Sequence, residues 1–179
     1  MESEFSIPGY NLYGLNISSK NFRGIIMYVH MSLIACQMQV SSLFQEFLVV
    51  LIKYLDKCML TVGAFYRSPS SNSNNDEFLF ELIDHLKTSV NDKLLMIGDF
   101  NLCDMNWHDW SICSSSNSAY KFLKCLRKNF FIQHVKFPTR ARGTQTPSVL
   151  DLVISNDYFI DELHQCSPLG VIRPLYIAW

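Results

Sequence analysis

The sequence predicts a mixed α/β sandwich in a single domain, and three observations support this. The chain has 179 residues, of which 49% are hydrophobic and 13% aromatic, so it can bury one sizeable core. In its first third, short apolar runs occur in pairs separated by polar segments, as in β-hairpins. Further along, strands alternate with amphipathic helical segments, which favours sheets covered by helices over a purely parallel sheet. We therefore assign residues 1–179 to one domain.

Four strands are predicted in the first third of the chain. Each is a run rich in apolar and β-branched residues that polar turn residues interrupt. The predicted strands are residues 10–15, 24–29, 47–53 and 59–66, with connecting turns at residues 18–21 and 56–57.

Two amphipathic helices are predicted next. The first follows a loop of Ser, Asn and Pro at residues 68–75, is capped by Asp76 and runs to about Thr88. Its leucines and Phe78 recur at helical spacing. The second helix covers residues 118–128 and carries Leu123 and Leu126 on its apolar face.

Three further strands accompany these helices. They cover residues 93–97, 130–135 and 149–155, and the first of them ends at Gly98. The segments 102–116 and 138–147 are polar and read as irregular loops.

The charge distribution suggests a surface for a polyanion. The net charge is only −1, but residues 111–150 contain no Asp or Glu. Seven cations lie in this window: Lys121, Lys124, Arg127, Lys128, Lys136, Arg140 and Arg142. A local basic face in a neutral protein is typical of nucleic-acid binding. A solvated helix face followed by a basic loop is an equally good interpretation.

The cysteines indicate an intracellular protein with reduced thiols. Six cysteines occur without CxxC pairs, and the acidic start of the chain lacks the basic region of a secretory signal. We expect a nuclear or cytoplasmic location. No apolar stretch is long enough to span a bilayer, so no membrane association is expected. A zinc site built from Cys103, His108, Cys113 and Cys125 matches no standard ligand spacing and is disfavoured.

The most informative segment is Gly98-Asp99-Phe100-Asn101, which follows an apolar run. Side chains two residues apart at a strand end point to the same side. A carboxylate can there orient a water or bind a divalent metal, while an amide holds a phosphate oxygen. The pair suits phosphodiester hydrolysis. Such strand endings are common in α/β proteins, so the motif needs support from elsewhere in the chain.

Two further segments give that support. They are Tyr66-Arg67-Ser68-Pro69 at a strand end and the run 150–156, which contains Asp151 and follows Pro138-Thr139-Arg140. In this order, the three segments resemble the endonuclease/exonuclease/phosphatase superfamily. Together with residues 7–13 and 23–29, they most resemble the apurinic-type endonuclease domain of non-LTR retrotransposons, over about residues 5–170.

The resemblance implies a four-layer α/β sandwich with two mixed sheets and a Mg²⁺-dependent phosphodiesterase site at one edge. Asp99 matches the aspartate that orients or activates the attacking water. Asn101 matches the asparagine that steadies this aspartate and the phosphate. Tyr66 matches the tyrosine that hydrogen-bonds a phosphate oxygen, and Asp151 matches the aspartate that supports the catalytic histidine.

Other assignments from the sequence concern DNA contacts and structural alternatives. Thr139, Arg140 and Arg142 are candidate contacts to a DNA backbone phosphate, although a solvated loop is an equally good interpretation. Asp99 and Asn101 could instead be turn residues, and Tyr66 a half-buried strand aromatic. Asp151 would be costly to bury unpaired and could belong to a purely structural pair.

The sequence also departs from the family pattern. The family's early asparagine and metal-binding glutamate would lie upstream of residues 7–13, and no metal ligand is assigned in this chain. A Ser-Asp-His triplet is expected after Pro168-Leu169-Gly170 and is not present, and His164 is a poor substitute. We therefore expect an incomplete fold that lacks the first strands and the Ser-Asp-His strand, with marginal stability.

The sequence is compatible with three functions. The first is a Mg²⁺-dependent DNA endonuclease domain of a retrotransposon-derived protein, impaired in this chain because the metal glutamate and catalytic histidine are lacking. The alternative is a non-catalytic fragment that binds nucleic acid weakly. A small-molecule or inositol phosphatase is less favoured by the neighbourhoods of Tyr10, Tyr66 and Leu150. We expect a monomer with DNA as partner and no small-molecule cofactor.

Overall fold

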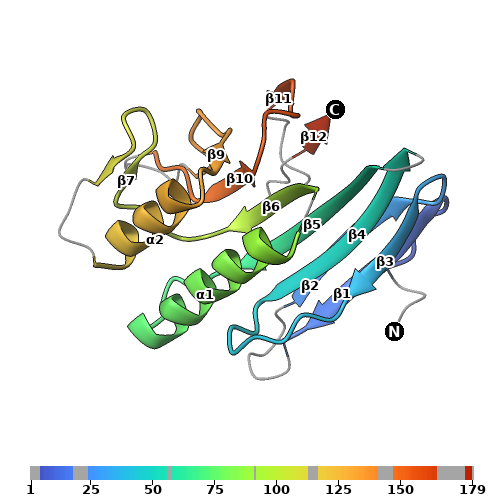
Figure 1. Ribbon diagram of the computed structural model, residues 1–179, viewed down its shortest axis with the longest axis horizontal. Helices are drawn as coiled ribbons and strands as arrows, with labels where there is room; N and C mark the ends of the chain where they lie inside the picture. Colours follow the sequence, from blue (N-terminus) through green and yellow to red (C-terminus); the bar gives the residue numbers. More distant parts are fainter. Residues whose placement is uncertain are drawn as a thin grey trace.

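A six-stranded mixed sheet forms the centre of the protein in a computed structural model that describes residues 5–17, 24–55, 58–90, 92–112, 117–140, 147–164 and 176–178. The strand order is β3-β4-β5-β6-β10-β9 (Figure 1). These strands are β3 (Ile34–Met38), β4 (Phe47–Leu55), β5 (Cys58–Tyr66), β6 (Lys93–Asp99), β10 (Asp151–Ser155) and β9 (Ile132–Gln133). The remaining elements are β1 (Tyr10–Asn16), β2 (Gly24–His30), α1 (Ser73–Ser89), β7 (Met105–Asn106), β8 (Ser111–Ile112), α2 (Asn117–Lys128), β11 (Glu162–His164) and β12 (Tyr176–Ala178).

The directions of the central strands follow from their connections. Strands β4 and β5 pair antiparallel along their whole length as a hairpin. Helix α1 connects β5 to β6, and these two strands run parallel, as a helical crossover requires. Strand β10 returns antiparallel to β6. As a result, the carboxyl ends of β5 and β6 and the start of β10 meet at one end of the sheet.

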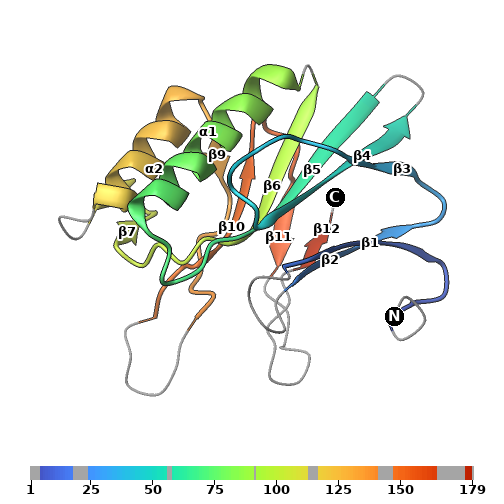
Figure 2. The same ribbon diagram turned by 90° about the horizontal axis from the view of Figure 1, so that it is seen from below.

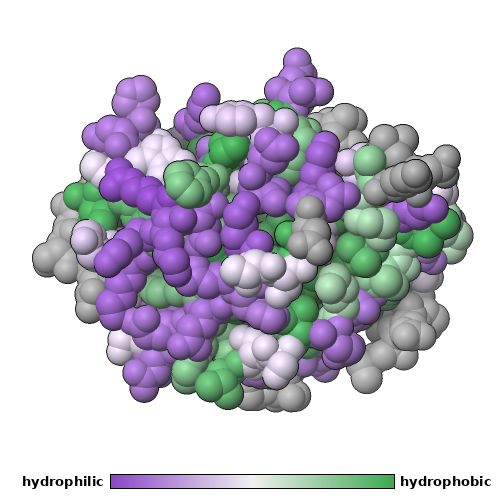
Figure 3. Space-filling model, in the orientation of Figure 1, coloured by the Kyte–Doolittle hydropathy of each residue, from purple (hydrophilic) through white to green (hydrophobic). Residues whose placement is uncertain are grey.

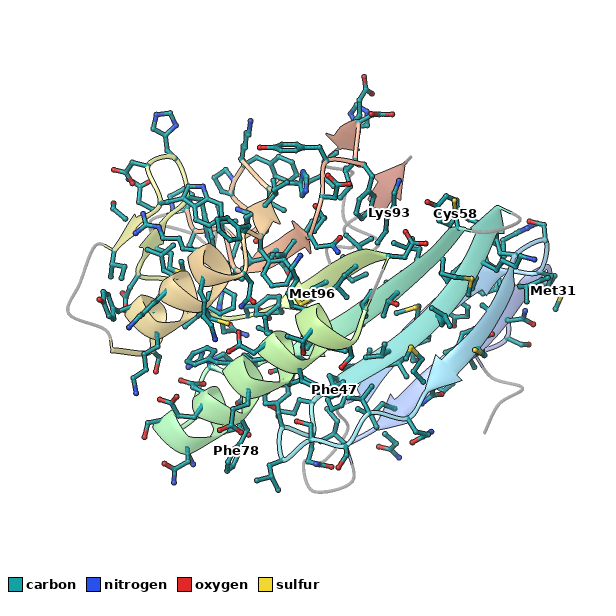
Figure 4. All side chains as sticks on the ribbon, viewed as in Figure 1. Met31, Phe47, Cys58, Phe78, Lys93 and Met96 are labelled. Carbon is teal, nitrogen blue, oxygen red and sulfur yellow. The ribbon has the colours of Figure 1, made fainter. Side chains whose placement is uncertain are left out.

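The sheet has a helical layer on one face and strands on the other. Helices α1 and α2 cover one face, while β1–β2 and β11–β12 lie on the opposite side (Figure 2). Each face of the sheet packs into its own hydrophobic core, and successive side chains of β6 point alternately to the two faces. Leu94 and Met96 pack toward the helices, and Leu95 and Ile97 toward β1–β2. Figure 4 labels Met96 near α1 and Lys93 at the start of β6, at the end opposite Asp99.

The start of α1 differs from the sequence prediction. Asn72, rather than Asp76, is the N-cap, and its side-chain oxygen accepts a hydrogen bond from the Asn75 N–H. Asp76 is buried in the first turn and forms an ion pair with Arg67. The prediction of Asp76 as the cap is therefore wrong, because a buried arginine competes for its carboxylate.

Helix α2 lies beside α1, and two of its cations are neutralised there. Lys121 forms an ion pair with Glu77, and Lys128 with Asp84 at 2.7 Å. Figure 3 shows a largely hydrophilic surface over these two helices. For the part of the basic segment 111–150 that lies in α2, the structure thus matches the interpretation as a solvated helix face.

The predicted strands are found with shifted ends, and some short elements were missed. Strand β6 continues through Gly98 to Asp99, so the prediction that it ends at Gly98 is wrong. Strand β3 had no sequence prediction, and β9 is much shorter than predicted. The prediction that residues 102–116 are irregular is wrong at β7 and β8, which pair as two short strands. The predicted turns at residues 18–21 and 56–57 lie outside the described residues, apart from their flanking strands.

The predicted mixed α/β class is confirmed. The large sheet is mixed, since β5 and β6 are parallel and its other pairs are antiparallel. The β1–β2 pair forms a separate antiparallel layer. The four-layer arrangement, the second mixed sheet and the incompleteness of the fold stay predictions. Within the described ranges, no helix combines the length and apolar character needed to cross a membrane.

Candidate functional site

Three of the residues predicted from the sequence form one row across the central sheet. Tyr66 ends β5, Asp99 ends β6 and Asp151 begins β10. The register pairs Tyr66 with Asp99 and Asp99 with Asp151. Directly opposed residues on neighbouring strands share a face and lie roughly 5 Å apart. Because Tyr66 and Ile97 pack into the core beside β1–β2, the row lies on the face opposite the helices.

Both carboxyl groups of the row have raised pKa values. Burial, and then the charge of Asp151, raise the pKa of Asp99 from 3.8 to about 6. The pKa of Asp151 is also raised, by burial, although Thr139 and Arg140 oppose the shift. At neutral pH, Asp99 is therefore ionised but close to its pKa, as a proton acceptor should be.

Asn101 is held against Asp99 by a left-handed turn. Its φ is 49°, a conformation that Asn tolerates better than most residues. In this turn the Asn101 N–H donates to the Asp99 carboxylate at 3.1 Å. The Asn101 side-chain amide donates to the Arg67 carbonyl at 2.9 Å. Asp99 and Asn101 thus lie together, as predicted, and hydrogen bonds from both the side chain and the backbone of Asn101 lower the pKa of Asp99.

Thr139 and Arg140 lie beside the start of β10. The buried Thr139 hydroxyl oxygen accepts hydrogen bonds from the N–H groups of Leu150 and Asp151, both at 3.0 Å. Arg140 pairs with Ser148 through the backbone. In the part of the chain that the structure describes, the Arg140 Nε is buried without a hydrogen-bond partner. Arg142 lies outside the described residues, and the DNA contacts of all three residues stay predictions.

One residue of the site was missed by sequence reasoning. Arg67 follows Tyr66 directly and is 7% exposed, and it contacts both α1 and the segment after Asp99. An arginine at the end of an apolar strand, followed nine residues later by Asp76 in a first helical turn, was the available signal. Sequence alone cannot pair them, because Asp76 is also a good capping residue.

The described residues do not form a zinc site. Among them, no group of three or more His, Cys, Asp or Glu could hold a metal ion. Cys103 is exposed, whereas Cys125 is buried, and burial together with Asp84 raises the pKa of its thiol to about 12. Cys113 lies outside the described residues. His164 is on β11, where it contacts Glu162.

The geometry can be compared with known proteins. A family model described as "Endonuclease-reverse transcriptase" matches residues 60–169. The fold is similar to that of the endonuclease domain of TRAS1, a telomere-specific non-LTR retrotransposon, with a TM-score of 0.66 and 14% identity over 93% of this chain and 76% of that one.

Two further solved structures share the fold. An endonuclease/exonuclease/phosphatase family protein from Bacteroides thetaiotaomicron gives a TM-score of 0.53 at 10% identity, over 96% of this chain and 71% of that one. The human Nocturnin catalytic domain gives a TM-score of 0.50 at 9% identity, over 83% of this chain and 61% of that one. No curated protein matches the sequence.

Proposed function

We infer the function from the premise that this chain belongs to the endonuclease-reverse transcriptase family, and we propose that it carries the nuclease part of a retrotransposon-derived protein. The proposed reaction is hydrolysis of a DNA phosphodiester bond. The resemblance to the endonuclease/exonuclease/phosphatase superfamily is confirmed, whereas the substrate and the reaction are our proposal.

The observation that carries the proposal is the row of Tyr66, Asp99 and Asp151. In the proposed mechanism, Asp99 takes a proton from the attacking water, which its raised pKa allows above about pH 6. The water oxygen bonds to phosphorus while the P–O bond to the leaving sugar oxygen breaks, and that oxygen takes a proton from solvent. The Asn101 N–H keeps the Asp99 carboxylate in place. The Tyr66 hydroxyl donates to a phosphate oxygen, and Arg140 offers positive charge to the same phosphate.

A magnesium requirement is part of the proposal. Mg²⁺ would neutralise charge on the phosphate during hydrolysis. Asp99 and Asp151 are hard oxygen donors of the kind that it prefers. However, the described residues hold no group of three His, Cys, Asp or Glu that could bind a metal. They do not by themselves fit a complete metal site, so we assign no step to the ion.

We further propose that the 179-residue polypeptide is a slow enzyme. Two described histidines of its second half have other partners: His134 contacts Ser155, at the end of β10 far from Asp151, and His164 contacts Glu162. Neither is placed to assist Asp99. The alternative is a non-catalytic fragment that binds nucleic acid weakly. We also propose that the protein is a monomer and acts in the nucleus or cytoplasm.

Plasmid nicking tests the proposed reaction. We expect slow, Mg²⁺-dependent conversion of supercoiled plasmid to the nicked form, with a loss of at least about 100-fold in Asp99→Ala, as for other general-base residues. Asp161→Asn, on the exposed surface, serves as the matched control. Nicking that persists unchanged in Asp99→Ala would overturn the role of Asp99. No nicking by the wild-type protein would favour the non-catalytic alternative.

Salt-dependent DNA binding tests the role of Arg140. We expect Arg140→Gln to weaken binding of a short duplex and to reduce the dependence of log K on log salt by about one unit, because one phosphate contact is lost. Fluorescence anisotropy at several salt concentrations would measure both. Lys124→Gln is the control, because Lys124 is an exposed cation on α2, across the sheet from the row. Equal losses in the two variants would argue for a diffuse basic surface.

A further inference from the structure

A buried ion pair lies directly behind the row. The Arg67 guanidinium contacts Asp76 at two points, from Nε to Oδ1 at 2.7 Å and from Nη2 to Oδ2 at 2.9 Å. The two side chains are 7% and 2% exposed. Ser71 also donates to the Asp76 carboxylate. The pair thus joins the end of β5 to the first turn of α1.

The same guanidinium also reaches the segment after β6. Its Nη1 donates to the carbonyl oxygen of Asn101 at 3.2 Å and lies 3.4 Å from that of Phe100. In the other direction, the Asn101 side-chain amide donates to the Arg67 carbonyl, and the Arg67 N–H donates to the Asp99 carbonyl. Arg67 and residues 99–101 are therefore joined on both sides of the Asn101 turn.

A buried ion pair of this kind often adds little to the stability of a fold. Desolvation of two charges often cancels their attraction, and apolar residues of similar size can replace such a pair without loss. Burial alone would raise the pKa of Asp76, but hydrogen bonds from Arg67, Ser118 and Ser71 hold it below the usual value. The pair is thus fully charged and fully bonded, which favours a fixed geometry more than a gain in stability.

We propose that Arg67 is a positioning residue for Asp99: by binding the carbonyls of Phe100 and Asn101, it keeps the Asn101 N–H on the Asp99 carboxylate. The planar guanidinium suits this task because it binds a carboxylate with one edge and carbonyl groups with its remaining donor. The catalytic consequence rests on the proposed function, but the positioning itself does not.

The other charged and polar groups near Asp99 are known. Asp151 faces it from β10, Tyr66 from β5, and Arg140 contributes positive charge from the segment before β10. Asn101 is the neighbour whose hydrogen bonds lower the pKa of Asp99. The Arg67 guanidinium binds the carbonyl groups of residues 100 and 101, so its replacement should affect the Asp99 carboxylate through the Asn101 N–H.

The test replaces the pair without leaving a buried charge. The double variant Arg67→Met/Asp76→Leu removes both charges and the bonds to Phe100 and Asn101. Arg67→Lys keeps the charge for Asp76 but cannot bind the carboxylate and the carbonyls together. The matched control is Glu77→Gln/Lys121→Gln, which removes a half-exposed ion pair that joins the next residue of α1 to α2.

The readouts are independent of nuclease activity. They are hydrogen exchange of the Asn101 amide and the ¹³C carboxyl titration of Asp99, both by NMR in metal-free buffer, with thermal unfolding as the check on folding. In the double variant we expect about tenfold faster exchange at Asn101 and a rise of about one unit in the titration midpoint of Asp99. Arg67→Lys should shift both in the same direction, and the control should shift neither.

Two results would overturn the proposal. One is a cooperatively folded double variant in which the Asn101 exchange and the Asp99 midpoint match the wild type, which would make the pair purely structural. If the double variant does not fold, Arg67→Lys decides in the same way. Should the wild-type protein fail to nick DNA, the proposed function fails, while the NMR results still decide whether Arg67 positions Asp99.

Discussion

Gly98→Ala is expected to prevent the protein from reaching a stable folded state. Gly98 has a φ of 148°, which residues with a side chain rarely adopt. A Cβ at this position would lie 1.9 Å from the Phe65 carbonyl oxygen, which is backbone and cannot rotate away. The strand β6 would have to separate from β5 at the point that carries Asp99. We expect a loss of at least about 4 kcal/mol in the free energy of unfolding.

Gly14→Ala is the matched control for this change. Gly14 is in β1, where an added Cβ would have its nearest recorded neighbour at 3.9 Å, and its backbone does not require glycine. Urea unfolding followed by circular dichroism should show a change of less than about 1 kcal/mol for Gly14→Ala. A stably folded Gly98→Ala protein with normal β5–β6 pairing would contradict the reported close approach of the two strands.

Asp99→Asn is expected to stabilise the protein at neutral pH while removing its proposed activity. The pKa of Asp99 is about 6 in the folded state, against an ordinary value of 3.8. Between these values the folded protein binds more protons than the unfolded chain, so the contribution of Asp99 to stability falls as pH rises from about 4 to 6. Above pH 6 the ionised Asp99 carboxylate lowers the free energy of unfolding. The full shift corresponds to about 3 kcal/mol, which partial exposure to solvent reduces to about 2.

Chemical unfolding between pH 4 and pH 8 measures this effect. Asp99→Asn should be more stable than the wild type by about 2 kcal/mol at pH 7.5, and the difference should vanish near pH 4. The exposed Asp161→Asn provides the control and should change stability little at either pH. A variant that is less stable at neutral pH would mean that Asp99 has a favourable partner in the folded state. Stability gained on loss of a functional charge is common at active sites.

Parts of the fold were predictable because their signals are local. Strands β4 and β5 are apolar runs, and the helix over residues 118–128 has regular apolar spacing. The pattern of apolar residues was therefore enough to locate them. Strand β3 was missed because it is a short edge strand of the large sheet, and its residues do not alternate regularly between apolar and polar types. Gly98 was placed at a strand end because glycine usually interrupts a strand, whereas here a close approach to β5 requires it.

Parts of the candidate site were predictable for a different reason. Asp99 and Asn101 were found because they follow an apolar run, which marks the end of a buried strand. Tyr66 and Asp151 were assigned because their segments resemble those of a known family. Arg67 was not found, because its role depends on Asp76 and Asn101, which lie 9 and 34 residues away. Contacts at that separation have no local signature in a single sequence.

The sequence by itself predicted the α/β class, the family resemblance and four candidate site residues. Only the tertiary structure decided that Tyr66, Asp99 and Asp151 share one row, because the register between strands sets which residues face each other. It also decided the raised pKa of Asp99 and the partners of Arg67 and Asp76. Burial and the distance between charges cause these properties, and both arise only when separate segments of the chain pack together.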